Sequence, residues 1–271
     1  MEASITHLKN LINTMRKIFF LILIGPLLLS QNFQTKDSLK TLAQSNFKSM
    51  KIFKNEDGKF LPTESYSYNH DKREIIIKNI SDKNKDWIKT IVTLDSTYNI
   101  KEEEKIIEAM IISENENALV KKQVSLKKKY VYSNNTVSIK DYNYKGGLMG
   151  KKFMLFDKEN RIIESINLFN IPEDIIITEI EKYNWIDSSS YNYEKLTFNA
   201  PKSKVTGVYK LDKYGDRESF KGSFIFNNKA ELIDYHFNEK IKKIDSRGNL
   251  IQVYEIKNGN KTLIEERKII Y

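Results

Sequence analysis

The sequence contains no cysteine, and only four prolines, ten glycines and three histidines among its 271 residues. The absence of cysteine excludes disulfide bonds, thiol catalysis, iron–sulfur clusters and cysteine-ligated zinc. The fold must therefore be stabilised by its own hydrophobic core, and the chain is long enough to build one. The formal net charge is +9. Lys and Glu are interleaved with apolar residues, which is typical of antiparallel strands with one solvated face.

A long apolar run is also missing. The run at Ile18–Leu29 has 12 residues, whereas a membrane-spanning helix needs about 20. Arg16 and Lys17 precede this run and a small residue follows it, so residues 1–30 are predicted to be a secretory signal peptide. Met15 is an alternative start of translation. The alternative to a cleaved signal peptide is an N-terminal anchor that stays uncleaved. We expect an exported protein, located in the periplasm, on the outer surface or outside the cell, with membrane contact only through the leader before cleavage.

A short phrase recurs along the chain. Its order is an apolar residue, Asp or Asn, two polar residues, Gly or Asn, a polar residue and an apolar pair, and its clearest copy is Ile244–Ile251. Such an order predicts a strand, a tight turn and a second strand. The six copies are Phe53–Leu61, Leu94–Glu102, Phe156–Glu164, Leu211–Ser219, Phe226–Asp234 and Ile244–Gln252.

The turn inside this phrase has specific backbone requirements. Asp or Asn at its start can accept a hydrogen bond from the backbone two residues later. Gly or Asn at its fourth position tolerates the positive φ that a type I turn with a bulge needs. Gly58 fits after a shift of one residue, whereas Ala230 fits poorly because of its Cβ, so that turn is expected at Asn227 and Asn228. Positive φ is expected at Asn99, Asn160, Gly215 and Gly248.

Two longer stretches extend the pattern. Tyr130-Val131-Tyr132 leads through Gly146-Gly147 to Phe156–Ile162, and Ile244–Asn249 leads through Gly259 to Glu266–Tyr271. These stretches resemble the YD repeats of the RHS-like family, whose core is Tyr-Asp-x-x-Gly-x-Leu, and are most similar to degenerate copies in secreted proteins of the Bacteroidetes type. Here the leading Tyr is replaced by Phe, Leu or Ile, and the spacing is irregular. The resemblance implies β architecture and export, and it carries no catalytic residues.

The sequence predicts an all-β fold. We expect a long curved antiparallel meander of hairpins, open or rolled into a partial barrel, with at most a short N-terminal helix. Lys101–Glu116 fits a helix or a strand, and the repeat register favours a strand. Residues 31–271 are expected to form one extended domain, with a hinge near 185–190 as the alternative. Helical spacing within 35–50 is found for Leu39, Leu42, Ala43 and Phe47.

The sequence shows no catalytic constellation. His7 lies in the leader, and His70 and His236 have no metal-like partner, so both are expected to be structural. Gly146–Lys152 lacks the Gly-Lys-Ser/Thr ending of a phosphate-binding loop and predicts a hairpin turn. The 36 Asp and Glu residues are too many to identify a carboxylate pair for glycoside hydrolysis. We predict no enzyme activity, no cofactor and no metal site.

One segment combines basic and aromatic residues. It contains Lys127, Lys128, Lys129, Tyr130 and Tyr132. Such a cluster can bind a phosphate-rich polymer or a glycan through charge and stacking. The same lysines would also protect an exposed edge strand from aggregation, and this second interpretation is favoured. Export argues against nucleic acid as the partner.

We therefore expect an exported, non-catalytic β-repeat protein of the bacterial envelope, which binds an envelope protein or a glycan or has a structural role. A carrier that holds an apolar ligand such as a lipid inside a rolled sheet is the alternative, and a polysaccharide hydrolase is the third hypothesis. The oligomeric state is left open. The tyrosines expected to contact the partner are Tyr66, Tyr68, Tyr130, Tyr132, Tyr142 and Tyr144, although alternation along strands would assign half of them to the core.

Overall fold

The computed structural model describes residues 39–80, 88–112, 119–171, 174–198, 202–226 and 229–271. Nearly all of them lie in β-strands, so the all-β prediction is confirmed. One short helix, residues 39–44, precedes the first strand. Within the described ranges, no helix is long and apolar enough to cross a membrane.

The described residues form a single 17-stranded sheet. The sequence of Lys101–Glu116 fits a helix or a strand. In the structure, residues 101–112 of this segment form a strand, and residues 113–118 lie outside the described residues. The strands are β1 Ser49–Glu56, β2 Lys59–Asn69, β3 Glu74–Asn79, β4 Lys89–Leu94, β5 Ile100–Ile112, β6 Leu119–Ser133, β7 Thr136–Tyr142, β8 Leu148–Phe156, β9 Ile162–Ile171, β10 Asp174–Trp185, β11 Ser190–Thr197, β12 Ser203–Leu211, β13 Arg217–Phe226, β14 Lys229–His236, β15 Glu239–Ile244, β16 Leu250–Lys257 and β17 Asn260–Ile270.

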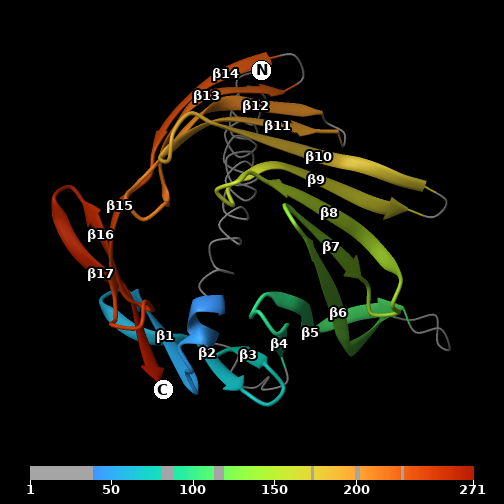
Figure 1. The fold of residues 1–271 in the computed structure, drawn as a ribbon, viewed down its shortest axis with the longest axis vertical. Helices are drawn as coiled ribbons and strands as arrows, with labels where there is room; N and C mark the ends of the chain where they lie inside the picture. The colour runs from blue at the N-terminus through green and yellow to red at the C-terminus, as the bar shows by residue number, and fades with distance from the viewer. Residues whose placement is uncertain (1–38, 81–87, 113–118, 172–173, 199–201, 227–228) are drawn as a thin grey trace, which may run out of the picture.

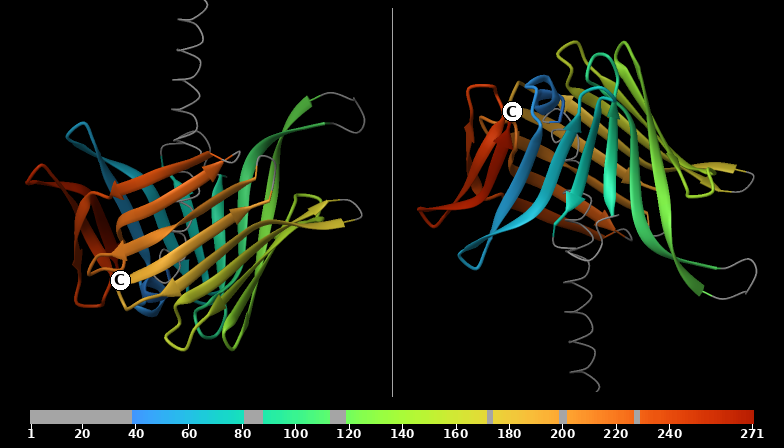
Figure 2. Two further views of the ribbon diagram at one scale, coloured as in Figure 1. Left: turned by 90° about the horizontal axis from the view of Figure 1, so that it is seen from above. Right: turned by 90° about the horizontal axis from the view of Figure 1, so that it is seen from below.

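The sheet is a meander. From β1 to β14 each strand pairs antiparallel with the next, as do β15 with β16 and β16 with β17, and β17 returns to pair with β1. No pairing joins β14 to β15 in the described part of the chain, although only Phe237 and Asn238 separate them. The sheet therefore curves into a ring that stays open at this point (Figure 1), and Figure 2 shows its strands from above and from below.

Five turns share one hydrogen-bonding pattern. The side-chain oxygen of the first residue accepts backbone N–H groups two and four residues later at 2.8–2.9 Å, in turns that start at Asp95, Asn143, Asp157, Asp212 and Asp245. The expected positive φ is confirmed for Asn160, Gly215 and Gly248.

Two turns differ in detail from the prediction. The expectation for Asn99 is wrong, because the fourth residue counted from Asp95 is Tyr98, which has a φ of 64°. At the first hairpin, both Asp57 and Gly58 have positive φ, the pattern of a two-residue type I′ turn. The turn expected at Asn227 and Asn228 lies outside the described residues.

The short helix packs on the concave face of the sheet (Figure 1), and this face carries two buried clusters. Ile162 contacts both clusters, so they share one face, here called the inner face; the opposite face is the outer face. The first cluster contains Leu42, Ala43, Phe47, Met50, Ile52, Tyr68, Ile75, Val92, Leu94, Ile100, Tyr130, Val137, Ile139, Met154 and Phe156, and the second contains Tyr183, Tyr191, Tyr193, Tyr209 and Phe220.

Candidate functional site

Three of the six selected tyrosines point to the inner face at buried or half-buried positions. Tyr68 and Tyr130 belong to the first core cluster, at 9 % and 6 % exposure, so neither offers a surface to a partner. Tyr66 is half-buried, and its hydroxyl donates a 2.5 Å hydrogen bond to Glu64. Burial, followed by the charge of Glu64, raises the pKa of Tyr66. These side chains stabilise the sheet.

The other three tyrosines are accessible but lie apart. Tyr132 is exposed on the same side of β6 as Tyr130, two residues further along. Tyr144 is exposed in the turn between β7 and β8, where the Nζ atom of Lys145 lies 5.9 Å from its ring centroid. Tyr142 is half-buried, and the Nζ atom of Lys129 lies 5.6 Å from its ring centroid.

Strand alternation also divides the predicted lysine cluster. Lys128 lies on the same face as Tyr130 and its Nζ is 3.8 Å from a carboxylate oxygen of Asp141. Lys127 and Lys129 point to the outer face. The Nζ of Lys127 is 3.6 Å from carboxylate oxygens of both Glu102 and Glu104 on β5. The five residues therefore do not form one contiguous site.

The edge-strand interpretation of these lysines is wrong. β6 pairs with β5 on one side and with β7 on the other, so it lies inside the sheet. The two sheet edges are instead formed by β14 and β15, for which only β13 and β16 are found as partners among the described strands. Protection of an exposed edge cannot explain the lysines of β6.

The pairing of β6, β7 and β8 brings three lysines together on the outer face. Lys129 lies directly opposite Lys140, and Lys140 lies directly opposite Lys151. Directly opposed residues have Cα atoms about 5 Å apart. Within the described part of the chain, no ion pair is found for any of the three. We call Lys129, Lys140 and Lys151 the lysine row.

Sequence reasoning missed two members of this row. The adjacent Asn134 and Asn135 favour a hairpin turn, and a hairpin centred there places Lys140 opposite Lys129. Lys151 is set by the next hairpin, where a register shift occurs between Asp141 and Tyr142. A shift of one residue turns side chains to the other face, so this last member required the coordinates.

Elsewhere on the outer face, two lysines near a second feature have acidic partners. A hollow of about 1050 Å³ lies over β10–β14 and is lined by Asn184, Asn192 and Thr206, among others. Beside it, Lys204 contacts Glu194 at 2.7 Å and Lys221 contacts Asp234 at 3.6 Å. Opposite charges on neighbouring strands stabilise a sheet, whereas like charges that face each other destabilise it.

The inner face of β10 and β11 carries one cluster of charges that is satisfied within the chain. Buried Glu181 accepts hydrogen bonds from the hydroxyl groups of Tyr193, at 2.6 Å, and of Tyr183, at 3.2 Å. Lys195, whose side chain is 12 % exposed, lies 2.5 Å from Glu179 and 4.0 Å from Glu181. Burial, and then the negative charge of Glu181, raises the pKa of both tyrosines. We call these five residues the glutamate–tyrosine cluster.

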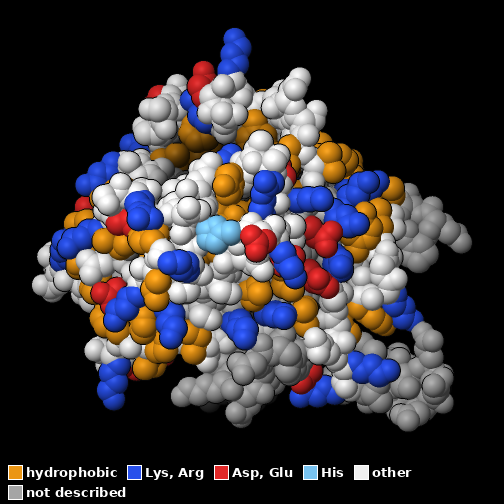
Figure 3. Space-filling view, turned by 60° about the horizontal axis from the view of Figure 1, so that its bottom comes forward, with side chains coloured by type: hydrophobic (Ala, Val, Ile, Leu, Met, Phe, Trp, Pro, Cys, Tyr) orange, Lys and Arg blue, Asp and Glu red, His pale blue; other side chains and the backbone are white. Residues whose placement is uncertain are grey.

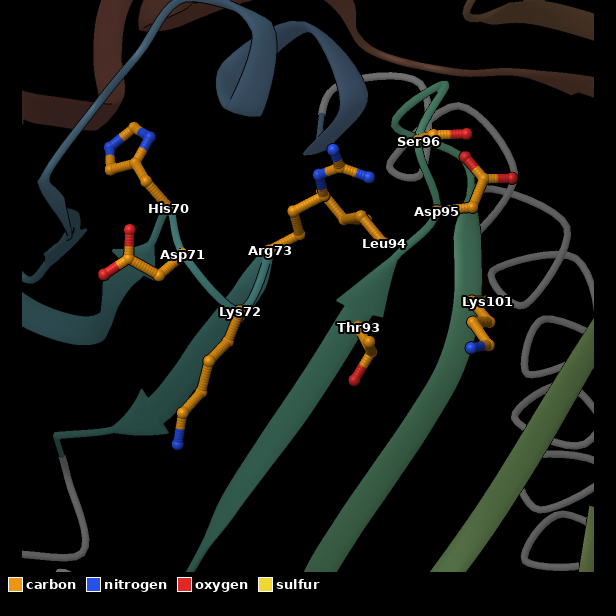
Figure 4. A pocket seen from close by; sticks show the side chains of 9 residues that line it. All are labelled: His70, Asp71, Lys72, Arg73, Thr93, Leu94, Asp95, Ser96 and Lys101. Carbon is orange, nitrogen blue, oxygen red and sulfur yellow. The ribbon is translucent and has the colours of Figure 1, made fainter.

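A second hollow, of about 540 Å³, lies where the turns β2–β3 and β4–β5 meet. Its lining includes His70, Lys72, Arg73, Asp95 and Lys101. Figure 4 shows the charged side chains spread around the turns, with His70 and Lys72 pointing to opposite sides, and Figure 3 shows basic and acidic side chains interspersed over this side of the molecule.

Two polar side chains of this hollow, His70 and Asp95, have structural partners. The Nε2 atom of His70 is 3.2 Å from the carbonyl oxygen of Phe47, and its ring packs against Tyr68. Asp95 accepts the turn hydrogen bonds described above.

The other histidine of the sheet, His236, lies on exposed β14, and its Nε2 atom is 3.7 Å from Oδ1 of Asp234. Among the described residues, no group of three or more His, Asp and Glu is arranged to hold a metal ion.

No protein-family model matches the chain, and no curated protein matches it. Two solved structures have a weak likeness to it. One is a porin-like protein from Bacteroides uniformis ATCC 8492, with 7 % identity over 82 % of this chain and 97 % of that chain and a TM-score of 0.33. The other is a porin-like protein from Bacteroides vulgatus ATCC 8482, with 11 % identity over 83 % and 99 % and a TM-score of 0.37.

Proposed function

We propose that the chain is an exported, non-catalytic binding protein of the bacterial envelope whose lysine row binds closely spaced anionic groups. The leader predicted at residues 1–30 motivates the envelope location. The anionic chemistry is motivated by one observation: three lysines face one another on interior strands without an ion pair among the described residues.

The energetics favour a ligand over a structural role for the lysine row. Like charges placed directly opposite each other on a sheet cost stability. A bound phosphate or carboxylate group would remove this repulsion, because several ammonium groups could then share its oxygens. Tyr142, next to Lys129, adds an aromatic surface on which part of such a ligand can stack.

The two alternatives have less support. A carrier for an apolar ligand needs an open apolar groove, whereas the inner face carries two buried clusters. A hydrolase needs two facing carboxylates at a suitable separation in an accessible site. Glu179 and Glu181, an enclosed pair of carboxylates, are already in contact with Lys195 and with two tyrosine hydroxyls.

The experiment compares two triple variants of the exported, processed protein that remove the same positive charge. The first is Lys129→Gln, Lys140→Gln, Lys151→Gln. The matched control is Lys121→Gln, Lys204→Gln, Lys221→Gln, in which each lysine has an acidic partner, namely Glu108, Glu194 and Asp234. Binding of long-chain polyphosphate and polygalacturonate is measured by cosedimentation at two salt concentrations.

The parent protein is expected to bind at least one of these anionic polymers, and more weakly at higher salt because counterions compete for the same charges. Loss of the lysine row should weaken binding by about 100-fold, on the basis of about 1 kcal/mol per lysine near an anionic surface. The control triple should change it severalfold at most. Equal losses in both triples, or no binding by the parent, would reject the proposal.

A further inference from the structure

A row of apolar side chains runs beside the lysine row on the outer face. In β6 and β8, Val131 and Phe153 lie two residues beyond Lys129 and Lys151, so they point to the same side. The row then continues from Phe153 through directly opposed partners on β9, β10 and β11. We call Val131, Phe153, Ile166, Ile180 and Leu196 the apolar row.

The apolar row does not belong to the core. Both buried clusters lie on the inner face, whereas Val131 is 57 % exposed and Phe153 is 41 % exposed. The solvated face of an antiparallel sheet is normally polar. An apolar strip on this face indicates an interaction surface.

The dimensions of the surface are set by the sheet. Neighbouring strands are about 4.8 Å apart, so a row from β6 to β11 extends over about 24 Å. Only Ser138, between Val131 and Phe153, interrupts the apolar side chains. The lysine row flanks the β6–β8 part of the strip, and Lys204, directly opposite Leu196, follows its other end.

We infer that the processed protein docks on the surface of a membrane leaflet rich in anionic phospholipid, with the lysine row on the phosphate groups and the apolar row at the boundary with the acyl chains. This inference rests on the proposed function and identifies the source of the anionic groups. Basic side chains beside a strip of Phe, Ile, Leu and Val are the combination that holds a protein in the interface plane.

A dissolved anionic polymer would satisfy the lysine row but would leave the apolar row in water. A lipid surface satisfies both, which is why it is preferred as the occupant. The sequence alone predicts membrane contact only through the leader. The register across β6–β11 adds a second, reversible contact made by the folded sheet.

The experiment uses the processed protein and vesicles of phosphatidylcholine, alone or with about one third phosphatidylglycerol. The test variant, Phe153→Thr with Ile180→Thr, keeps all lysines and uses a β-branched residue that suits strands. The control variant, Leu232→Thr with Ile244→Thr, removes apolar side chains that are 93 % and 56 % exposed elsewhere on the sheet. Should the double test variant fail to fold, Val131→Thr replaces it, since Val131 is the most exposed member of the row.

The parent protein and the control variant should bind the anionic vesicles at least tenfold more tightly than the neutral ones. The test variant should bind the anionic vesicles about tenfold more weakly than the parent, because less apolar area is buried, while its binding to polyphosphate is unchanged.

Vesicle binding that needs the lysine row but is unaffected by Phe153→Thr with Ile180→Thr would overturn the inference and leave the proposed function intact. Binding to polyphosphate alone, without vesicle binding, would also overturn it. If neither vesicles nor polyphosphate respond to loss of the lysine row, the proposed function itself fails.

Discussion

Two groups of charged residues in the same sheet have opposite surroundings. In the glutamate–tyrosine cluster on the inner face of β10 and β11, Lys195 lies 2.5 Å from Glu179, and Glu181 accepts two tyrosine hydroxyls. In the lysine row on the outer face of β6–β8, Lys140 faces a lysine on each side. The first arrangement satisfies its charges within the chain, whereas no ion pair is found for Lys140 among the described residues.

The difference separates charges that hold the fold together from charges that we propose are available to a partner. A buried carboxylate that loses its partners is costly, so each contact in the glutamate–tyrosine cluster contributes to stability. An exposed like-charge row costs stability instead. Substitutions in the two groups should therefore change stability in opposite directions.

The largest effect is expected for Glu181→Ala. This change leaves the hydroxyl groups of Tyr183 and Tyr193 without their acceptor and removes one carboxylate near Lys195. The free energy of unfolding should fall by about 3 kcal/mol, as for other broken buried pairs. Urea unfolding followed by circular dichroism measures it.

The matched control for this substitution is Glu194→Ala, which removes the partially exposed partner of Lys204 on the outer face of the same region. An exposed ion pair contributes at most about 1 kcal/mol, so a small loss is expected. Equal losses in the two variants would show that the buried contacts of Glu181 contribute no more to stability than an exposed ion pair does.

An intermediate effect is expected from acid acting on the turns. Partial desolvation raises the pKa of Asp245, but hydrogen bonds from Tyr271 and from the N–H groups of Asn249 and Arg247 outweigh it and hold this pKa below its usual value. The pKa values of Asp95 and Asp157 are also lowered, where turn hydrogen bonds again outweigh desolvation.

A carboxylate with a lowered pKa stabilises the fold above its unfolded-state pKa of about 3.9, and the contribution disappears as the pH falls through the folded-state pKa. The urea midpoint should therefore drop below about pH 4, and Asp245→Asn should reduce that drop by less than about 1 kcal/mol because the group is partly solvated. The control Asp234→Asn should leave the drop unchanged. An Asp245→Asn profile identical to the parent would contradict this role.

The sequence predicted the turns and the class of fold because both depend on local chemistry. Asp157, Asp212 and Asp245 accept the expected turn hydrogen bonds, and Asn160 has the expected positive φ. Tyr98 escaped prediction, because a tyrosine at positive φ is disfavoured locally and is held there by the surrounding hairpin. The resemblance to YD repeats stays a prediction.

The return of the last strand to the first could not be predicted, because the pairing of β17 with β1 joins segments that are far apart in the sequence. Lys127, Lys128 and Lys129 were assigned to the protection of an edge strand, although β6 lies between its sequence neighbours β5 and β7. Tyr130 was expected to contact a partner, but it faces the core. Alternation along β6 does not show which side of the strand is buried, because that depends on how the whole sheet curves. Local patterns indicate alternation, and the curvature of the whole sheet decides which face is buried.

The smallest expected effect gives the most direct test, because the substitution should raise the free energy of unfolding, whereas most substitutions lower it. In low salt, Lys140→Gln should raise the free energy of unfolding by about 0.2–1 kcal/mol, since it removes the central charge of the lysine row. About 1 M salt should abolish the gain by screening the charges, and Lys204→Gln should show no gain. The measurement is the urea midpoint of Lys140→Gln against the parent at low ionic strength: a higher midpoint is predicted, and a lower one would contradict the claim that the lysine row is kept for a partner rather than for the fold.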